Sequence, residues 1–161
     1  MEILLVRHSI SEANNRENVG YMAFAAKDAP LMPQGEVMAH TLGKTFRDVY
    51  NVVPEITEVA TSELLRAKQT AQFAGFTSLH AYAHLDEVVH GIPLKDLKEM
   101  LKNGELPDIA LEEAQKTLDN PPKEGVWVTH GLRIAGICSL LNVHQDKRLI
   151  PQFCEIRPIQ L

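Results

Sequence analysis

The sequence predicts an α/β fold, a sandwich in which helices cover a mostly parallel sheet. Residues 3–6 and 125–129 are apolar runs without alternation, which is typical of strands buried on both faces. Segments with helical spacing of apolar residues alternate with these and weaker strand candidates along the chain. The 161 residues show no repeat and no internal boundary, so we expect a single domain, 1–161.

The first half of the chain begins with the strand over residues 3–6. A polar loop follows over residues 14–27, with a short helical turn near 21–26, and Pro30-Leu31-Met32-Pro33-Gln34-Gly35 closes it. Apolar residues at helical spacing predict an amphipathic helix over 35–50, which Pro54 separates from a strand over 55–61. Ser62 is a good N-cap for the next helix, which ends near Gly75.

The second half continues the alternation. A short strand is predicted over 79–83, then helices over 93–101 and from Pro107 to about Leu118. The clearest strand after the first, residues 125–129, leads into an apolar helix over 132–141. Residues 152–159 read as a last strand, and Pro158 indicates either an edge position for that strand or its terminus.

The charge, the cysteines and the lack of long apolar segments exclude several classes of protein. The net charge of −5, with no long run of one sign, argues against nucleic-acid or membrane binding through bulk electrostatics. Cys138 and Cys154 stand in apolar surroundings outside any Cys-x-x-Cys pair, so we expect two buried thiols in a reducing compartment. The N-terminus lacks the features of a signal peptide, and no stretch is long enough to span a bilayer. A cytoplasmic protein is therefore expected.

Chemistry-bearing residues stand where the strands end. His8 and His130 each end one of the two strongest strands, and Arg7 precedes His8. Arg66 lies one turn into the helix that follows the strand end at Thr61. Because parallel strands bring their carboxyl ends to one edge, these side chains are expected to form a positive cluster of two imidazoles and two guanidiniums. A phosphoryl group suits such a cluster, since arginine forks match its oxygens.

The ordered motifs resemble those of the histidine phosphatase superfamily, the phosphoglycerate mutase-like group. In chain order they are Arg7-His8-Ser9 with Ser11 and Asn14, Pro30 to Gly35, Ser62-x-Leu64-x-Arg66-Ala67-x-Gln69-Thr70-Ala71, Leu85-Asp86-Glu87-x-x-x-Gly91, and Thr129-His130-Gly131. The resemblance covers most of the chain, and the ordered set is far more specific than any one motif. It implies a three-layer α/β/α sandwich of the phosphoglycerate mutase-like kind.

The resemblance also implies roles for particular residues. His8 would be the nucleophile that forms a phosphohistidine, with its other ring nitrogen held by a backbone carbonyl. The phosphate-binding residues would be Arg7, Asn14, Arg66, His130 and Ser62. Glu87 would protonate the leaving oxygen and later deprotonate water. No metal and no cofactor is needed, and the substrate would be a small phosphorylated compound or a phosphoprotein, bound by a monomer or a dimer.

The chain also departs from the family pattern. Ser9 stands in place of the signature glycine, which is costly if that position needs a positive φ, and Met32 replaces a threonine in the turn. No Gly-Glu-Ser motif lies between Glu87 and His130, and this stretch is short, which indicates a reduced lid and an open site. An open site favours a phosphatase over a mutase, which must keep its intermediate from water.

Other interpretations stay open. A phosphoglycerate-mutase-type phosphotransferase is one alternative, and a non-catalytic phospho-ligand or phosphoprotein binder, motivated by Ser9 and Glu87, is another. The string His84-x-x-Glu87-x-x-His90 resembles metal ligands, but its spacing fits no helix face. Gly131 to Gly136 follows a strand but lacks the dinucleotide pattern. His90 could contact the substrate, although a surface position is favoured for it. Arg133 reads as a surface or ion-pair residue, and Arg16 could reach the substrate from its loop.

Overall fold

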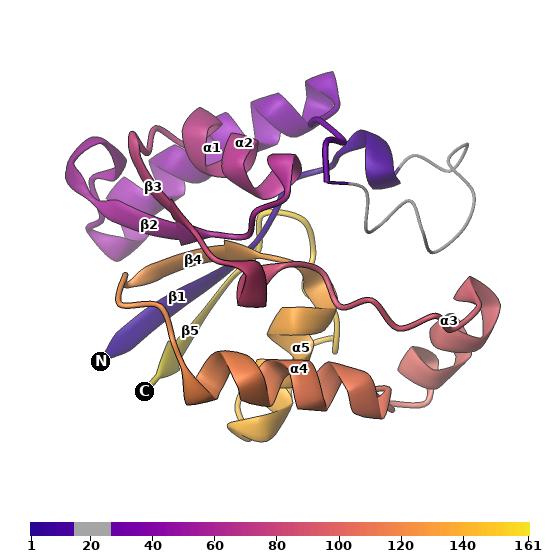
Figure 1. The fold of residues 1–161 in the computed structure, drawn as a ribbon. Coiled ribbons are helices and arrows are strands. Elements are labelled where there is room, and N and C mark those ends of the chain that lie inside the picture. Colours follow the sequence, from indigo (N-terminus) through magenta and orange to yellow (C-terminus); the bar gives the residue numbers. More distant parts are fainter. Residues whose placement is uncertain (15–26) are drawn as a thin grey trace.

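A computed structural model describes residues 1–14 and 27–161 (Figure 1). Its sheet has the order β3-β2-β4-β1-β5. The strands are β1 Glu2–Arg7, β2 Glu58–Thr61, β3 Ser78–Ala81, β4 Val126–Thr129 and β5 Ile156–Gln160. Neighbours pair in parallel except β5, which runs antiparallel to β1 at the edge. The predicted mostly parallel sheet, with Pro158 in an edge strand, is therefore confirmed.

Helices cover both faces of the sheet, as Figure 1 shows. They are α1 Pro33–Tyr50, α2 Leu65–Phe73, α3 Leu94–Lys102, α4 Asp108–Asp119 and α5 Gly131–Leu140. Helices α1 and α2 pack on one face, α4 and α5 on the other, and α3 lies beyond the sheet. The three-layer α/β/α sandwich is confirmed. Within the described part of the chain, the structure contains no helix with the length and apolar character that crossing a membrane requires.

Strand β1 explains why its sequence is an unbroken apolar run. Leu4 and Val6 point into the core beneath α1 and α2, whereas Ile3 and Leu5 point into the core beneath α4 and α5. All four are at most 4% exposed. Burying a side chain of this size contributes about 1.5–3 kcal/mol, so both layers depend on this strand.

Several predicted boundaries change. The strand predicted over 55–61 begins at Glu58, because Pro54–Ile56 forms a 3-10 turn that Pro54 initiates with its fixed φ. Ser62 is not the N-cap of α2, which begins at Leu65 after Leu64. Cys138 is buried as predicted, but Cys154 is only half-buried and adopts φ +61°. The turn predicted near residues 21–26, and Arg16, lie outside the described residues.

The topology brings three strand ends to one edge of the sheet. Arg7 of β1 is in register with Thr129 of β4, and Thr61 of β2 is in register with Val128. These strands are parallel, so the residues that follow each of them meet at the same edge. Gly35 holds α1 against this edge, because a Cβ there would lie 2.1 Å from the carbonyl oxygen of Ile10.

Candidate functional site

His8 follows β1 and is 2% exposed. Its Nδ1 lies 2.6 Å from the carbonyl oxygen of Ser9. A carbonyl oxygen only accepts, so Nδ1 carries the hydrogen and Nε2 carries the lone pair. Burial, together with the charges of Arg66 and Arg7, holds the pKa of His8 well below its usual value. His8 is thus a neutral imidazole with Nε2 available as a nucleophile.

His130 lies beside His8, with ring centroids 4.9 Å apart. It is fully buried, and burial followed by the charges of its neighbours lowers its pKa well below the usual value. His130 Nδ1 is a buried atom that has no hydrogen-bond partner among residues 1–14 and 27–161. An orphaned polar atom of this kind is costly in a protein interior unless a ligand or water satisfies it.

Ser62 orients His130 from the end of β2. Its Oγ lies 2.8 Å from His130 Nε2 and accepts a hydrogen bond from the backbone of Leu64. Ser62 also interacts with Asp86 and lowers the pKa of that carboxyl, against the larger raising effect of burial. The hydroxyl predicted to bind phosphate is therefore engaged in positioning a histidine.

Arg7 and Arg66 supply the positive charge of the site. Arg7 donates from Nη1 to the carbonyl oxygen of Pro151, 2.6 Å away, and its guanidinium lies 4.0 Å from the ring centroid of Phe153. Burial lowers the pKa of Arg7 to about 10, and burial also lowers the pKa of Arg66, which is 1% exposed. Because both imidazoles are neutral, the predicted cluster of four positive groups is a pair of guanidiniums beside two uncharged rings.

Glu87 completes the cluster from the coil after β3. Its Oε1 accepts a hydrogen bond from the backbone of Val88, and its Oε2 lies 3.9 Å from His130 Nδ1. Burial raises the pKa of Glu87, although Val88 N–H, Arg66 and Arg7 partly oppose this shift. A carboxyl group with a raised pKa beside a nucleophile is suited to general acid catalysis.

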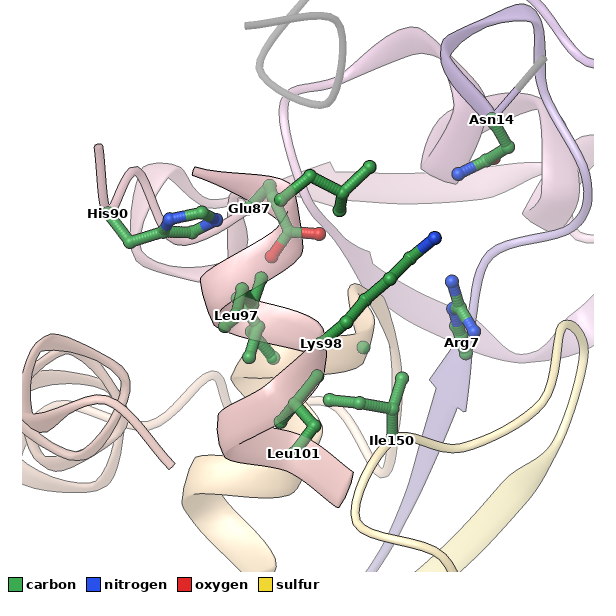
Figure 2. A pocket seen from close by; sticks show the side chains of 11 residues that line it. Arg7, Asn14, Glu87, His90, Leu97, Lys98, Leu101 and Ile150 are labelled. Carbon is green, nitrogen blue, oxygen red and sulfur yellow. The ribbon is translucent and has the colours of Figure 1, made fainter. Parts of the chain in front are cut away.

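Asn14 presents its amide nitrogen to the pocket drawn in Figure 2, which Arg7, Glu87 and His90 also line. Its Oδ1 accepts hydrogen bonds from both the backbone N–H and the hydroxyl of Ser11. The carbonyl side of the amide is thereby occupied, and the NH₂ remains as a neutral donor. The structure thus brings together every residue predicted for the site.

Ser9 fits its position without strain, because it does not adopt a positive φ. Its backbone N–H donates to Thr70 Oγ1 and its hydroxyl donates to the carbonyl oxygen of Gly35, 2.7 Å away. The glycine of the family signature is therefore not required here. Serine instead links the loop after β1 to the start of α1.

We expect Ser9→Gly to lower stability and leave catalysis unchanged. The substitution removes a buried hydrogen bond and adds backbone freedom to the unfolded chain, so the free energy of unfolding should fall by about 1–2 kcal/mol. Chemical denaturation measures this loss, and kcat should stay within about twofold. A large increase in kcat would instead mean that Ser9 restrains the nucleophile.

Gly131 and Gly136 stand where neighbouring atoms leave no room for a Cβ atom. A Cβ on Gly131 would lie 2.8 Å from Ile150 Cγ2 and 3.3 Å from Arg7 Nε. A Cβ on Gly136 would lie 2.5 Å from the carbonyl oxygen of Ala110. These close approaches account for both glycines without a nucleotide.

The burial of Arg133 and its hydrogen bonds were not predicted from the sequence. Arg133 is 2% exposed, so the expectation of a surface residue is wrong, although its pairing with Glu113 at 3.5 Å confirms an ion pair. Its Nε and Nη2 both donate to the carbonyl oxygen of Asp86, and Nη1 donates to that of Glu113. Arg133 thus fixes the backbone next to Glu87. The one available signal was a charged residue within an apolar helix.

His84, Glu87 and His90, whose spacing resembles a set of metal ligands, do not form a metal site. Among residues 1–14 and 27–161, no group of three or more His, Cys, Asp or Glu side chains is arranged to hold a metal ion. His90 is half-buried and lines the pocket, which differs from the favoured surface position and leaves substrate contact as its alternative role. Its Nδ1 accepts a hydrogen bond from the backbone of Ile92.

We expect acid to destabilise the fold through His8 and His130. Below their ordinary pKa of 6.5 the unfolded chain binds protons that these buried rings, with lowered pKa values, do not. The free energy of unfolding should therefore fall as the pH drops, by about 2 kcal/mol between pH 6.5 and 5.5. The raised pKa of Glu87 acts in the opposite direction.

Denaturation of His8→Gln across the same pH range isolates one histidine. The fall in the free energy of unfolding should shrink by about 1 kcal/mol. An unchanged pH dependence would mean that His8 binds a proton in the folded protein.

An α/β sandwich with two histidines and two arginines at the carboxyl ends of parallel strands has the architecture of a histidine phosphatase. The chain belongs to the histidine phosphatase superfamily, branch 1, whose profile matches residues 3–126. The match ends before His130, which the structure brings to the site. No curated protein sequence matches the chain.

Solved structures share the fold. The protein TTHB049 from Thermus thermophilus is 22% identical, with a TM-score of 0.69 over 99% of this chain and 93% of that one. A phosphoglycerate mutase from Thermus thermophilus is 22% identical, with a TM-score of 0.69 over 99% and 92%. A phosphoserine phosphatase from Entamoeba histolytica, in complex with 3-phosphoglyceric acid, is 19% identical, with a TM-score of 0.67 over 98% and 89%.

Proposed function

We propose that this protein hydrolyses phosphomonoesters through a phosphohistidine on His8, without a metal ion. The observation that carries the proposal is a buried, neutral His8 whose Nε2 is available as a nucleophile beside two guanidiniums. Covalent catalysis of this kind divides one difficult transfer into two easier ones.

In the first step, His8 Nε2 attacks phosphorus and the bond between phosphorus and the ester oxygen breaks. Glu87 in its protonated form, which burial favours, donates its proton to the leaving oxygen and releases the alcohol. In the second step, water attacks phosphorus, its proton passes to the Glu87 carboxylate, and the bond between phosphorus and nitrogen breaks. Inorganic phosphate leaves and His8 is neutral again.

In this proposal the non-bridging oxygens of the phosphate are held by four side chains, those of Arg7, Arg66, Asn14 and His130. Arg7 Nε and His130 Nδ1 are buried atoms with no hydrogen-bond partner in the described part of the chain, and a phosphate would provide one. A bound dianion also favours a proton on His130. Phosphoryl transfer depends mostly on positioning and on neutralising charge, which these groups supply.

A mutase is the second candidate, supported by the similar fold of the Thermus thermophilus phosphoglycerate mutase. Both activities share the phosphohistidine, and they differ in whether water or a second hydroxyl receives the phosphoryl group. The substrate would be a small phosphorylated compound or a phosphoprotein in the cytoplasm.

Hydrolysis of p-nitrophenyl phosphate with EDTA present tests the proposal. We expect turnover that EDTA does not reduce and that vanadate inhibits. Exchange between 2- and 3-phosphoglycerate, primed by a bisphosphate and exceeding hydrolysis, would favour the mutase. Tight vanadate binding without turnover of any ester would instead identify a phospho-ligand binder.

A further inference from the structure

We propose that the substrate is a phosphomonoester whose organic group is apolar, either one aromatic ring or a short branched chain. This inference rests on the proposed function, because it concerns what lies next to the bound phosphate. Its source is the wall of the pocket beside Arg7, Asn14 and Glu87, which is drawn in Figure 2.

Five aliphatic side chains form that wall. They are Leu94, Leu97, Leu101, Leu132 and Ile150. The three leucines of α3 lie at positions i, i+3 and i+7, so one face of this helix is turned to the pocket. Leu97 and Leu132 are 6% and 7% exposed and belong to a packed cluster, onto which Leu101 and Ile150 also pack. The wall is therefore a built surface of the pocket.

Few polar groups remain for the organic part of a substrate. Apart from Arg7, Asn14 and Glu87, the only polar side chains that line this pocket within the described residues are those of His90 and Lys98. A sugar phosphate would bring several hydroxyls against the leucines, and those hydroxyls would lose hydrogen bonds to water with only His90 and Lys98 nearby to replace them. An apolar group loses none and gains from burial.

Lys98 lies on the same face of α3. In Figure 2 its stem runs along the wall and its amine points toward the side of the pocket that holds Arg7 and Asn14. Its methylenes therefore extend the apolar surface, while its charge would face a phosphate bound beside Arg7. The whole pocket, its polar end included, has a volume of about 190 Å³, and a cavity of roughly 150 Å³ accommodates one benzene ring, so the organic group beside the phosphate must be small.

Binding of two phosphonates, which cannot be hydrolysed, tests the inference by calorimetry. We expect 3-methylbutylphosphonate to bind about tenfold more tightly than 3,4-dihydroxybutylphosphonate, because each buried methylene contributes about fourfold. The apolar ligand should also give the more negative heat-capacity change, the mark of apolar burial. Equal affinities, tighter binding of the diol, or no binding of either ligand would overturn the inference.

Two variants of α3 test whether the aliphatic wall causes the preference for the apolar phosphonate. Leu101→Ser should weaken binding of 3-methylbutylphosphonate about fourfold and leave the diol unchanged. Met100→Ser is the matched control, since Met100 is also half-buried on α3 but does not line the pocket, and it should change neither affinity. If both variants weaken the apolar ligand equally, the wall is not the binding surface. The wild-type comparison decides the inference even if Leu101→Ser fails to fold.

Turnover separates this inference from the proposed function. Wild-type kcat/KM should be about tenfold higher for 3-methylbutyl phosphate than for glycerol 3-phosphate. Hydrolysis of p-nitrophenyl phosphate with a preference for glycerol 3-phosphate would overturn the inference alone. Absence of all hydrolysis, with the phosphonate preference intact, would overturn the proposed function alone.

Discussion

His8→Ala is expected to lower kcat by at least about a thousandfold, because it removes the atom that would accept the phosphoryl group. The remaining arginines can bind phosphate but cannot form the covalent intermediate. Vanadate or phosphate should therefore still bind, and only the chemistry should be lost. Circular dichroism and thermal unfolding establish that the variant is folded.

Rapid quenching with a radiolabelled phosphomonoester measures the same step directly. The wild-type protein should retain acid-labile, base-stable label, whereas His8→Ala should retain none. His40→Ala is the matched control, since His40 is exposed on α1 away from the site, and it should be labelled like the wild type. Wild-type turnover in His8→Ala would contradict the mechanism, and label on a different histidine would reassign the nucleophile.

Glu87→Gln is expected to lower kcat/KM for alkyl phosphates by about 10²–10⁴-fold and for p-nitrophenyl phosphate by about tenfold or less. An alkoxide leaves only when it is protonated, whereas nitrophenolate leaves without a proton. The value of kcat/KM reports the first transfer, in which Glu87 would act as the acid. Glu99→Gln, on the exposed side of α3, should have no effect.

The pH profile provides a second measure of Glu87. Burial raises its pKa, and the acid must be protonated to donate. The wild-type kcat/KM for an alkyl phosphate should therefore fall as the pH rises through this pKa, and Glu87→Gln should lose that limb. Equal losses for alkyl and aryl esters, with the limb retained, would exclude Glu87 as the acid.

Much of the fold could be predicted because its signals are local. The apolar run of β1 alternates between two cores, so a strand buried on both faces follows from the residues themselves. Helix and strand ends were less certain, as the late start of α2 at Leu65 illustrates. There the N-cap preference of Ser62 competes with contacts to His130 and Asp86 that lie far away in sequence.

The sequence by itself determined the alternation of strands and helices, and it determined which residues stand at the strand ends, including His8 and His130. Only the tertiary structure decided what surrounds them. Contacts between distant segments make both imidazoles neutral and join Ser62 to His130. Such contacts also bury Arg133 beneath the backbone next to Glu87. Hydrophobic periodicity is a local property that can be read from neighbouring residues, whereas burial and hydrogen-bond partners are defined only after the layers have packed.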